Sequence, residues 1–205
     1  MKEEIQGTPA GRALAWFKAH RGVARTSEIV RSGIHPRTLY ELRDEGLVEV
    51  VSRGVYRLAG LDPMENPGFV AAATRVPNAV ICLISALAFH DITSQIPHFV
   101  YIAIKRGAET PRVEHPPLSV HRFSDQSLNY GIGVHQIDGI DVKIFSPEKT
   151  LADCFKFRNK IGLDVFQEAF KLYRSRFKLD VGKLIDAARV CRVESAIRPY
   201  LEASL

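Results

Sequence analysis

The sequence of 205 residues predicts an α+β protein in two parts. Residues 8–58 are predicted to form three capped helices followed by a short hairpin. From residue 99 the apolar residues recur at every second position, which is the period of a strand and not that of a helix. After residue 146 the helical spacing returns and continues toward the C-terminus. The predicted order is therefore helices and a hairpin, then a small sheet, then more helices.

The first two helices are predicted from their ends. Thr8 stands at an N-cap position, and Pro9 follows at the first helical position, where its missing N–H would be unpaired anyway. Thr26 is predicted to cap a second, short helix with Glu28 in its first turn, and Gly33 ends it. The segment between residues 26 and 46 therefore contains a tight turn between two helices.

The third helix has an apolar stripe and a polar face. Pro36 suits its first turn, which leaves His35 at the N-cap. Leu39 and Leu42 are three residues apart and define the buried stripe. Gly46 ends the helix in the manner of a C′ glycine. The opposite side carries Arg37, Tyr40, Glu41 and Asp44.

A hairpin with a basic tip follows this helix. The segments "LVEVV" and "GVYRL" are rich in β-branched residues and are separated by Ser52, Arg53 and Gly54. The whole order predicts a winged helix-turn-helix over residues 1–62. In such a domain the second helix of the pair lies in the DNA major groove, with its N-terminal residues nearest the base edges.

The predicted DNA-binding residues are donors suited to phosphates and base edges. They are Arg25, His35, Arg37, Thr38, Tyr40, Arg43, Arg53 and Arg57. Arg53, at the hairpin tip, is placed to reach a neighbouring phosphate or the minor groove. Glu41 and Asp44 argue against a purely electrostatic mode of binding. An alternative interpretation is a small module that only contacts proteins.

The segment "TSEIVRSGIHPRTLYELRDEGLVEVVSRGVYRL" resembles the N-terminal domain of the AbiEi family, the antitoxin and repressor component of type IV toxin–antitoxin systems in abortive infection and phage defence. The resemblance is carried by the "RTLYEL" helix, the break at Gly46 and the "RGVY" wing. It implies a DNA-binding transcriptional repressor that autoregulates its own operon.

The second part, residues 63–205, is predicted as a mixed α/β domain with a small, mainly antiparallel sheet and a helical C-terminus. A linker is placed at residues 59–67, followed by helices over about 67–75 and 79–90. Four strands are predicted from "FVYIAIK", "LSVHRF", "GVHQID" and "IDVKIFS", the last two joined by the hairpin signal Asp138-Gly139. Ser146, Pro147 and Glu148 open the C-terminal helices.

The segments "ALAFHDI" and "FSPEKTLADCF" extend the AbiEi resemblance over nearly the whole chain. The resemblance implies binding to operator repeats in double-stranded DNA. It also implies that the second domain neutralises a nucleotidyltransferase-type toxin, AbiEii, without forming a stable complex with it.

Composition restricts the alternatives. The net charge of +5 is compatible with nucleic acid, and the absence of an apolar run of about 18 residues or of a signal-peptide pattern predicts a cytoplasmic chain without a membrane span. Cys82, Cys154 and Cys191 have no CxxC spacing and are expected to be reduced and buried. No metal site and no cofactor are predicted.

Two further hypotheses concern the second part. One hypothesis is a Mg²⁺-dependent nuclease guided by the winged helix, suggested by Asp138, Asp141 and Lys143. A turn and an exposed strand face explain these residues better. We therefore expect no enzymatic activity. Residues 156–178 hold seven basic and two acidic residues, and Lys171, Arg174 and Lys178 are predicted to form one helix stripe, either a solvated face or a second nucleic-acid surface.

Overall fold

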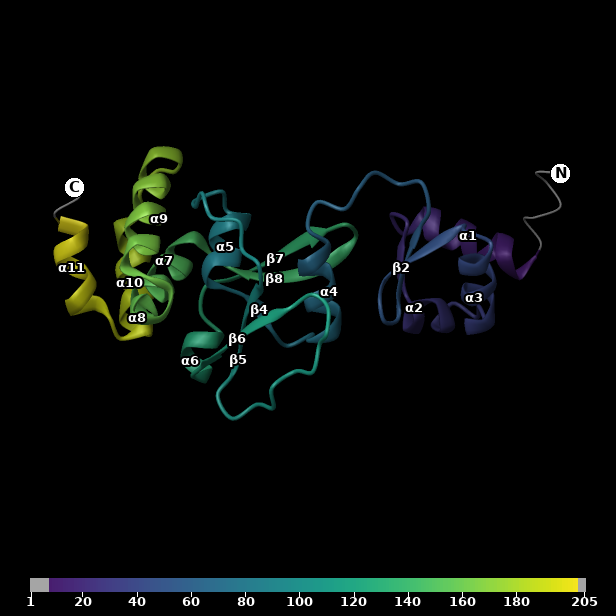
Figure 1. Ribbon diagram of the computed structural model, residues 1–205, viewed down its shortest axis with the longest axis horizontal. Helices are drawn as coiled ribbons and strands as arrows, with labels where there is room; N and C mark the ends of the chain where they lie inside the picture. Colours follow the sequence, from purple (N-terminus) through teal and green to yellow (C-terminus); the bar gives the residue numbers. More distant parts are fainter. Residues whose placement is uncertain (1–7, 203–205) are drawn as a thin grey trace. The chain divides into compact units, whose positions relative to one another are not determined.

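The computed structural model describes residues 8–202, and the chain forms two compact units (Figure 1). The first unit runs through Arg75 and includes the hairpin segment Gln136–Asp141. The second comprises Val76–His135 and the chain from Val142 onward. The first unit thus extends past the predicted boundary at residue 62, because the helix after the linker packs against a strand of this unit.

The first unit contains the three predicted N-terminal helices and a three-stranded sheet. Its elements are α1 (Pro9–Ala19), β1 (Val23–Arg25), α2 (Thr26–Arg31), α3 (Pro36–Asp44), β2 (Val48–Ser52), β3 (Val55–Leu58) and α4 (Pro67–Arg75). The sheet order is β1-β3-β2, and both pairings are antiparallel. The sequence did not predict β1, since three residues are too few to show a period of two. This arrangement is consistent with a winged helix-turn-helix.

One hydrophobic core holds the first unit together. Phe17 of α1, Ile29 of α2, and Leu39 and Leu42 of α3 are fully buried and belong to one cluster, which Tyr56 of β3 completes from the sheet. All three helices therefore contribute to a core shared with the sheet, and the orientation of α3 is fixed by packing rather than by its own short length.

The second unit alternates short strands and helices before its helical C-terminus. Its elements are β4 (Val80–Ile81), α5 (Leu83–Phe89), β5 (Val100–Lys105), β6 (Leu118–Phe123), α6 (Asp125–Leu128), β7 (Ile132–Ile137), β8 (Ile140–Phe145), α7 (Pro147–Lys156), α8 (Arg158–Ile161), α9 (Leu163–Arg176), α10 (Val181–Cys191) and α11 (Glu194–Glu202). Ser146 caps α7, and its hydroxyl accepts from the backbone N–H of Lys149 at 3.3 Å, which confirms the predicted start of this helix.

The sheet of five strands has the order β6-β5-β4-β8-β7. The β4–β5 pairing is antiparallel, but the β5–β6 and β4–β8 pairings are parallel, so the sheet is mixed and not mainly antiparallel as predicted. Residues 106–117 connect β5 to β6 and are long enough for a crossover. The two residues of β4 lie in an apolar run that the sequence assigned to a helix over 79–90; the helix itself covers only Leu83–Phe89.

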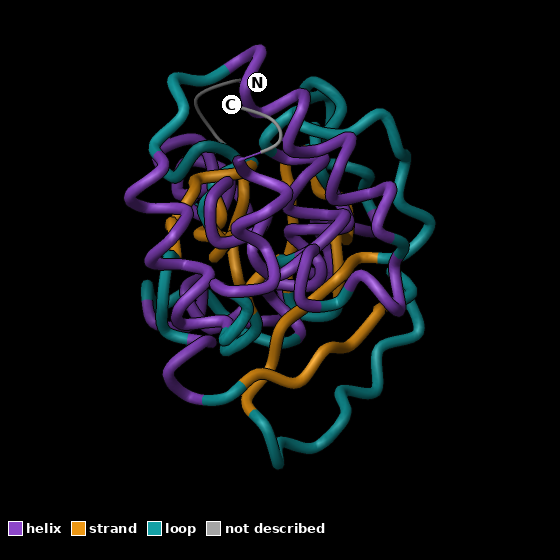
Figure 2. Tube along the Cα trace, turned by 90° about the vertical axis from the view of Figure 1, so that its left-hand side faces the viewer, coloured by secondary structure: helices purple, strands orange, loops and turns teal. Residues whose placement is uncertain are grey.

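Helix α7 lies at the centre of the helical layer and packs against α5, α9 and α10. Figure 2 shows this side of the second unit, with helices in front of the strands. Leu151, Phe155 and Phe166 are buried in the core between these helices. Within residues 8–202, none of the helices combines the length and the apolar character needed to cross a bilayer.

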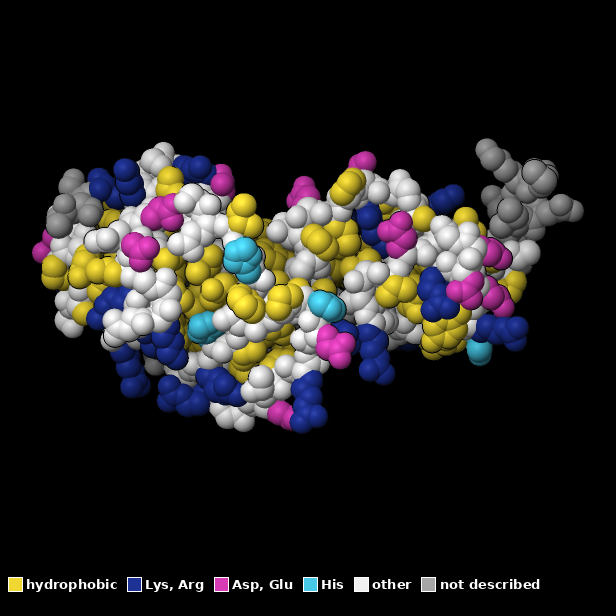
Figure 3. Space-filling view, in the orientation of Figure 1, with side chains coloured by type: hydrophobic (Ala, Val, Ile, Leu, Met, Phe, Trp, Pro, Cys, Tyr) yellow, Lys and Arg dark blue, Asp and Glu magenta, His cyan; other side chains and the backbone are white. Residues whose placement is uncertain are grey.

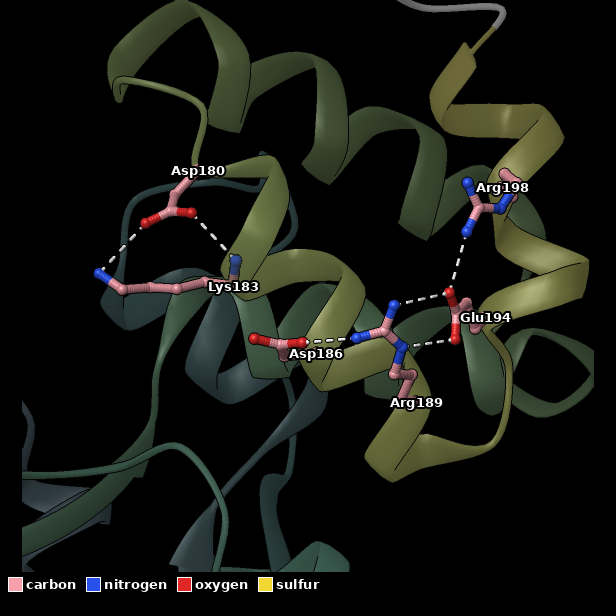
Figure 4. A network of polar contacts seen from close by, with 6 residues as sticks. All are labelled: Asp180, Lys183, Asp186, Arg189, Glu194 and Arg198. Carbon is pink, nitrogen blue, oxygen red and sulfur yellow. Dashed lines mark hydrogen bonds and ion pairs between the residues drawn. The ribbon is translucent and has the colours of Figure 1, made fainter.

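Helices α10 and α11 are joined by an exposed network of charges. Figure 4 shows its members Asp180, Lys183, Asp186, Arg189, Glu194 and Arg198. Arg189 Nε lies 2.8 Å from Glu194 Oε2, and Arg198 reaches Glu194 Oε1 at 2.9 Å. Glu194 thus links two arginines across the turn between the helices. Because the network is solvent-exposed, its pairs contribute little to stability.

A buried ion pair lies inside the second unit. The side chains of Lys149 and Asp153 are both fully buried on α7, and the Lys149 ammonium donates to the Asp153 carboxylate. Asp153 Oδ1 also accepts from Cys191 Sγ at 3.1 Å, and Lys149 Nζ lies 4.2 Å from the centroid of the Phe145 ring. Burial raises the pKa of Asp153, and the neighbouring Lys149 opposes that rise. The pair therefore ties α7 to α10 and β8.

The three cysteines are free and buried, as predicted. Burial raises the pKa of each thiol, to about 12 for Cys191. They act as small core residues rather than as nucleophiles.

We predict that the Asp153→Ala substitution lowers the free energy of unfolding by about 3–5 kcal/mol, because it leaves the Lys149 ammonium buried without its counter-ion. The double substitution Lys149→Met with Asp153→Leu removes both charges and should cost clearly less. Urea unfolding of both variants at neutral pH measures this difference. A double variant as unstable as the single one would contradict the role of the pair.

Candidate nucleic-acid interface

The start of α3 is built from its cap. The backbone N–H of Arg37 donates to His35 Nδ1 at 3.2 Å, and Pro36 occupies the first helical position. Gly33, with φ +83°, turns the chain between α2 and α3. These features confirm the predicted cap and turn. They leave the N-terminal end of α3 open to solvent, with His35 and Arg37 exposed beside it.

The buried side of α3 includes one residue that the sequence placed on the DNA surface. Leu39 and Leu42 are fully buried, as predicted. Thr38 is only 4% exposed, because it precedes Leu42 by four residues and so shares its face of the helix. The prediction of Thr38 as a DNA-binding residue therefore needs correction: its side chain faces the core.

The exposed side of α3 begins with an ion pair. Arg37 is 81% exposed, and its Nε lies 3.0 Å from Glu41 Oε1, one helical turn later. The spacing of four residues could have revealed this pairing from the sequence. An exposed pair of this kind contributes only about 0.2–1 kcal/mol, so Arg37 can leave Glu41 at little cost.

A second cluster lies along the same side of α3. The Arg43 guanidinium carbon is 5.5 Å from the centroid of the exposed Tyr40 ring, and Arg43 Nη2 lies 2.7 Å from Asp44 Oδ1. The hydrogen bond and charge of Asp44 raise the pKa of Arg43. The nearby Tyr56 side chain, when ionised, also raises the pKa of Arg43. Burial raises the pKa of the Tyr56 phenol. Tyr40 and Arg43 thus form an aromatic and cationic patch next to Arg37.

The hairpin turn is attached to the start of α2. The backbone N–H of Thr26 donates to the Gly54 carbonyl at 2.9 Å, and the Thr26 hydroxyl donates to the same oxygen at 3.3 Å. Gly54 has φ +79°, a conformation that favours glycine. Arg53 at the tip is exposed. Arg25 is half-buried and occupies the N-cap of α2, the position predicted for Thr26, and its backbone N–H donates to Glu28.

Arg57 does not lie on the predicted DNA surface. It belongs to β3, the central strand of the three-stranded sheet, and is only 8% exposed. Its guanidinium donates to the backbone carbonyl of Asp62. The sequence could not separate Arg57 from Arg53 because both lie in the same short hairpin. The exposed surface therefore comprises His35, Arg37, Tyr40 and Arg43 on α3, with Arg53 on the hairpin turn.

The predicted basic stripe on the C-terminal helices is incomplete. Lys171 and Arg174 are exposed on α9, but α9 ends at Arg176, and Phe177 has the extended φ of −122°. Lys178 therefore follows the helix and does not continue its stripe. Arg176 pairs with Asp91 instead.

The residues of the nuclease hypothesis form a turn and a strand face. Asp138 and Gly139 have φ of +48° and +79° and join β7 to β8, which confirms the predicted hairpin. The Asp141 carboxylate accepts from the Gln136 amide. In the part of the chain from Thr8 to Glu202, no three His, Cys, Asp or Glu residues are grouped to hold a metal ion.

Comparison with known proteins finds one family model that matches the first unit. Residues 12–59 match a family model described as "Transcriptional regulator, AbiEi antitoxin", which confirms the predicted resemblance over these residues and covers α1 through β3. No curated protein sequence matches the chain.

Among solved structures, the chain is similar to the RV2827C protein from Mycobacterium tuberculosis. The TM-score is 0.52 with 12% sequence identity, and the match covers 91% of this chain and 78% of that one. At this identity the likeness is one of fold, and it extends through both units.

We predict that Glu41→Gln increases the affinity for double-stranded DNA by up to about fivefold at low salt, because it frees Arg37 and removes a negative charge from the exposed face of α3. Fluorescence anisotropy with a labelled duplex measures the change. Glu202→Gln, an exposed acid of α11, is the matched control and should leave the affinity unchanged. Equal effects of both variants would show that only net charge matters.

A further prediction separates the two hairpin arginines. Arg53→Ala should reduce the slope of log K against log salt by about one unit, since each phosphate contact contributes about 0.9. Arg57→Gln should instead lower the melting temperature and leave that slope unchanged. If the Arg53 variant keeps the full slope, the hairpin turn does not contact phosphate.

Proposed function

We propose that the first unit is a winged helix-turn-helix that binds double-stranded DNA by placing α3 in the major groove. The observation that carries the proposal is the exposed face of α3, where His35, Arg37, Tyr40 and Arg43 lie together while Leu39 and Leu42 fix the opposite face in the core. An α-helix is about 10–12 Å across, which suits a major groove about 12 Å wide.

The position of these residues along α3 supports this docking. His35 and Arg37 lie at the N-terminal end, the end that contacts base edges in helix-turn-helix proteins. The helix N-terminus also attracts phosphate through its free N–H groups and dipole. Arg53 on the hairpin turn is an exposed cation suited to a backbone phosphate.

The interaction energies favour a switch of Arg37 from its ion pair with Glu41 to a contact with a base. A bidentate contact of arginine with guanine is worth about 1–3 kcal/mol of discrimination. The exposed pair with Glu41 contributes less than that. Glu41 then remains in the groove and disfavours binding to DNA in general, so that a correct base contact is needed to offset the repulsion.

At the level of the whole chain, we propose a cytoplasmic, non-enzymatic transcriptional repressor that acts as an antitoxin. The match of residues 12–59 to the AbiEi regulator family supports the repressor role. The proposal includes autoregulation through operator repeats upstream of its own gene. It also includes protection against a nucleotidyltransferase-type toxin without a stable complex, which the AbiEi-like segments of the second unit support.

We predict that Arg37→Ala weakens binding to the operator by about 1–3 kcal/mol while binding to a scrambled duplex changes less, because a base contact is lost. Gel shifts with the DNA upstream of the gene and with a scrambled duplex of equal length measure both affinities.

Lys183→Ala is the control, since Lys183 is an exposed cation of the second unit, on α10 and outside the basic segment 156–178. If Arg37→Ala weakens both duplexes equally, Arg37 contacts only phosphate. If neither affinity changes, α3 is not the DNA-binding helix and the proposed docking is wrong.

A further inference from the structure

A row of rings lies at the edge of the sheet in the second unit. The Tyr101 ring of β5 and the His121 ring of β6 are stacked, with centroids 5.7 Å apart and planes inclined by 18°. Phe157, between α7 and α8, meets His121 edge-on at 5.2 Å, and its ring is 5.4 Å from that of buried Phe123. The rings thus run from the core outward.

The outer members of this row are accessible. Tyr101, His121 and Phe157 are half-buried, and Tyr101 and Phe157 pack against the outside of the core. In the parallel register Tyr101 faces Ser119, and His121 faces Ala103, so all four side chains lie on one face of the sheet. Because β6 is an edge strand, no other strand among residues 8–202 covers this end of the row.

The orientation of the His121 ring is fixed. Ser119 Oγ and His121 Nε2 are 3.1 Å apart, which holds the imidazole beside Tyr101. Burial lowers the pKa of His121, and the charge of Lys160 lowers it further, so the ring is neutral at physiological pH. A neutral, oriented imidazole next to a phenol ring presents flat, weakly hydrated surface.

The charge beside these rings is positive. Lys160 is exposed, and its ammonium lies 5.9 Å from the centroid of the Phe157 ring. The surrounding segment, residues 156–160, contains Lys156, Arg158 and Lys160 and no acidic residue. Figure 3 shows Lys and Arg side chains gathered along the lower rim of the second unit, below the region of β5, β6 and α8.

We propose that Tyr101, His121, Phe157 and Lys160 form a binding site for single-stranded nucleic acid. An unpaired base stacks against the accessible part of this row of rings, and Lys160 contacts a phosphate of the same strand. Partly exposed aromatic rings on a sheet next to exposed cations suit single strands, whose bases are free to stack outside a helix. A duplex offers only its backbone here, because its bases are already stacked.

This site is independent of the DNA-binding role proposed for α3, since its residues all belong to the second unit. It gives the second unit a nucleic-acid ligand of its own, distinguished from operator DNA by strandedness rather than by sequence.

The test uses the full chain and a fluorescein-labelled oligouridine of 12 nucleotides, with anisotropy measured over a salt series. Tyr101→Leu and His121→Gln should each weaken binding roughly tenfold, as expected for loss of one stacking partner. Lys160→Gln should reduce the salt slope by about 0.7, the contribution of one phosphate in a single strand. Lys183→Gln, an exposed cation on α10 outside the basic segment 156–178, should change neither quantity.

Controls separate this proposal from the role of α3. Thermal unfolding confirms that each variant is folded, and His121→Gln provides the ring variant if Tyr101→Leu fails to fold. Arg37→Ala should weaken binding to duplex DNA and leave oligouridine binding unchanged. The site is overturned if the wild-type chain does not bind oligouridine at low salt. It is also overturned if the ring variants bind as the wild type does, or if Lys160→Gln and Lys183→Gln have equal effects.

Discussion

The packing of Leu39 and Leu42 into the core of the first unit determines which residues α3 presents to solvent. Nine residues are too few to form a stable helix alone, so α3 exists because α1, α2 and the sheet receive its apolar stripe. The same contacts fix the rotation of the helix. Thr38 is turned inward and Arg37 outward, although the two are neighbours in sequence.

The exposed face of α3 is balanced in charge. Arg37 lies against Glu41, and Arg43 lies against Asp44. A surface of this kind has little general attraction for a polyanion, since binding to phosphate depends on an excess of cations. The arrangement favours specificity over affinity, because each arginine gives up its acid only when it gains a better partner. The second unit differs, since residues 156–178 hold seven basic and two acidic residues.

Local chemistry in the sequence predicted the features that depend on a few neighbouring residues. The cap at His35, the turns at Gly33 and Asp138-Gly139, and the start of α7 at Ser146 all follow from such signals. The features that the sequence could not predict depend on pairing between distant segments. The parallel ladders beside β4 and the position of Arg57 in a central strand required partners far along the chain. Lys178 was misplaced for another reason, since the end of α9 carries no glycine or proline signal.

The docking of α3 in the major groove is tested most directly by hydrogen–deuterium exchange of the full chain with and without operator duplex. Bound DNA should slow exchange in peptides that cover residues 33–46 and 52–55, with the largest change at the N-terminal end of α3. Peptides from α9 should show a smaller change or none. Slowed exchange confined to the second unit, with α3 unaffected, would contradict the account.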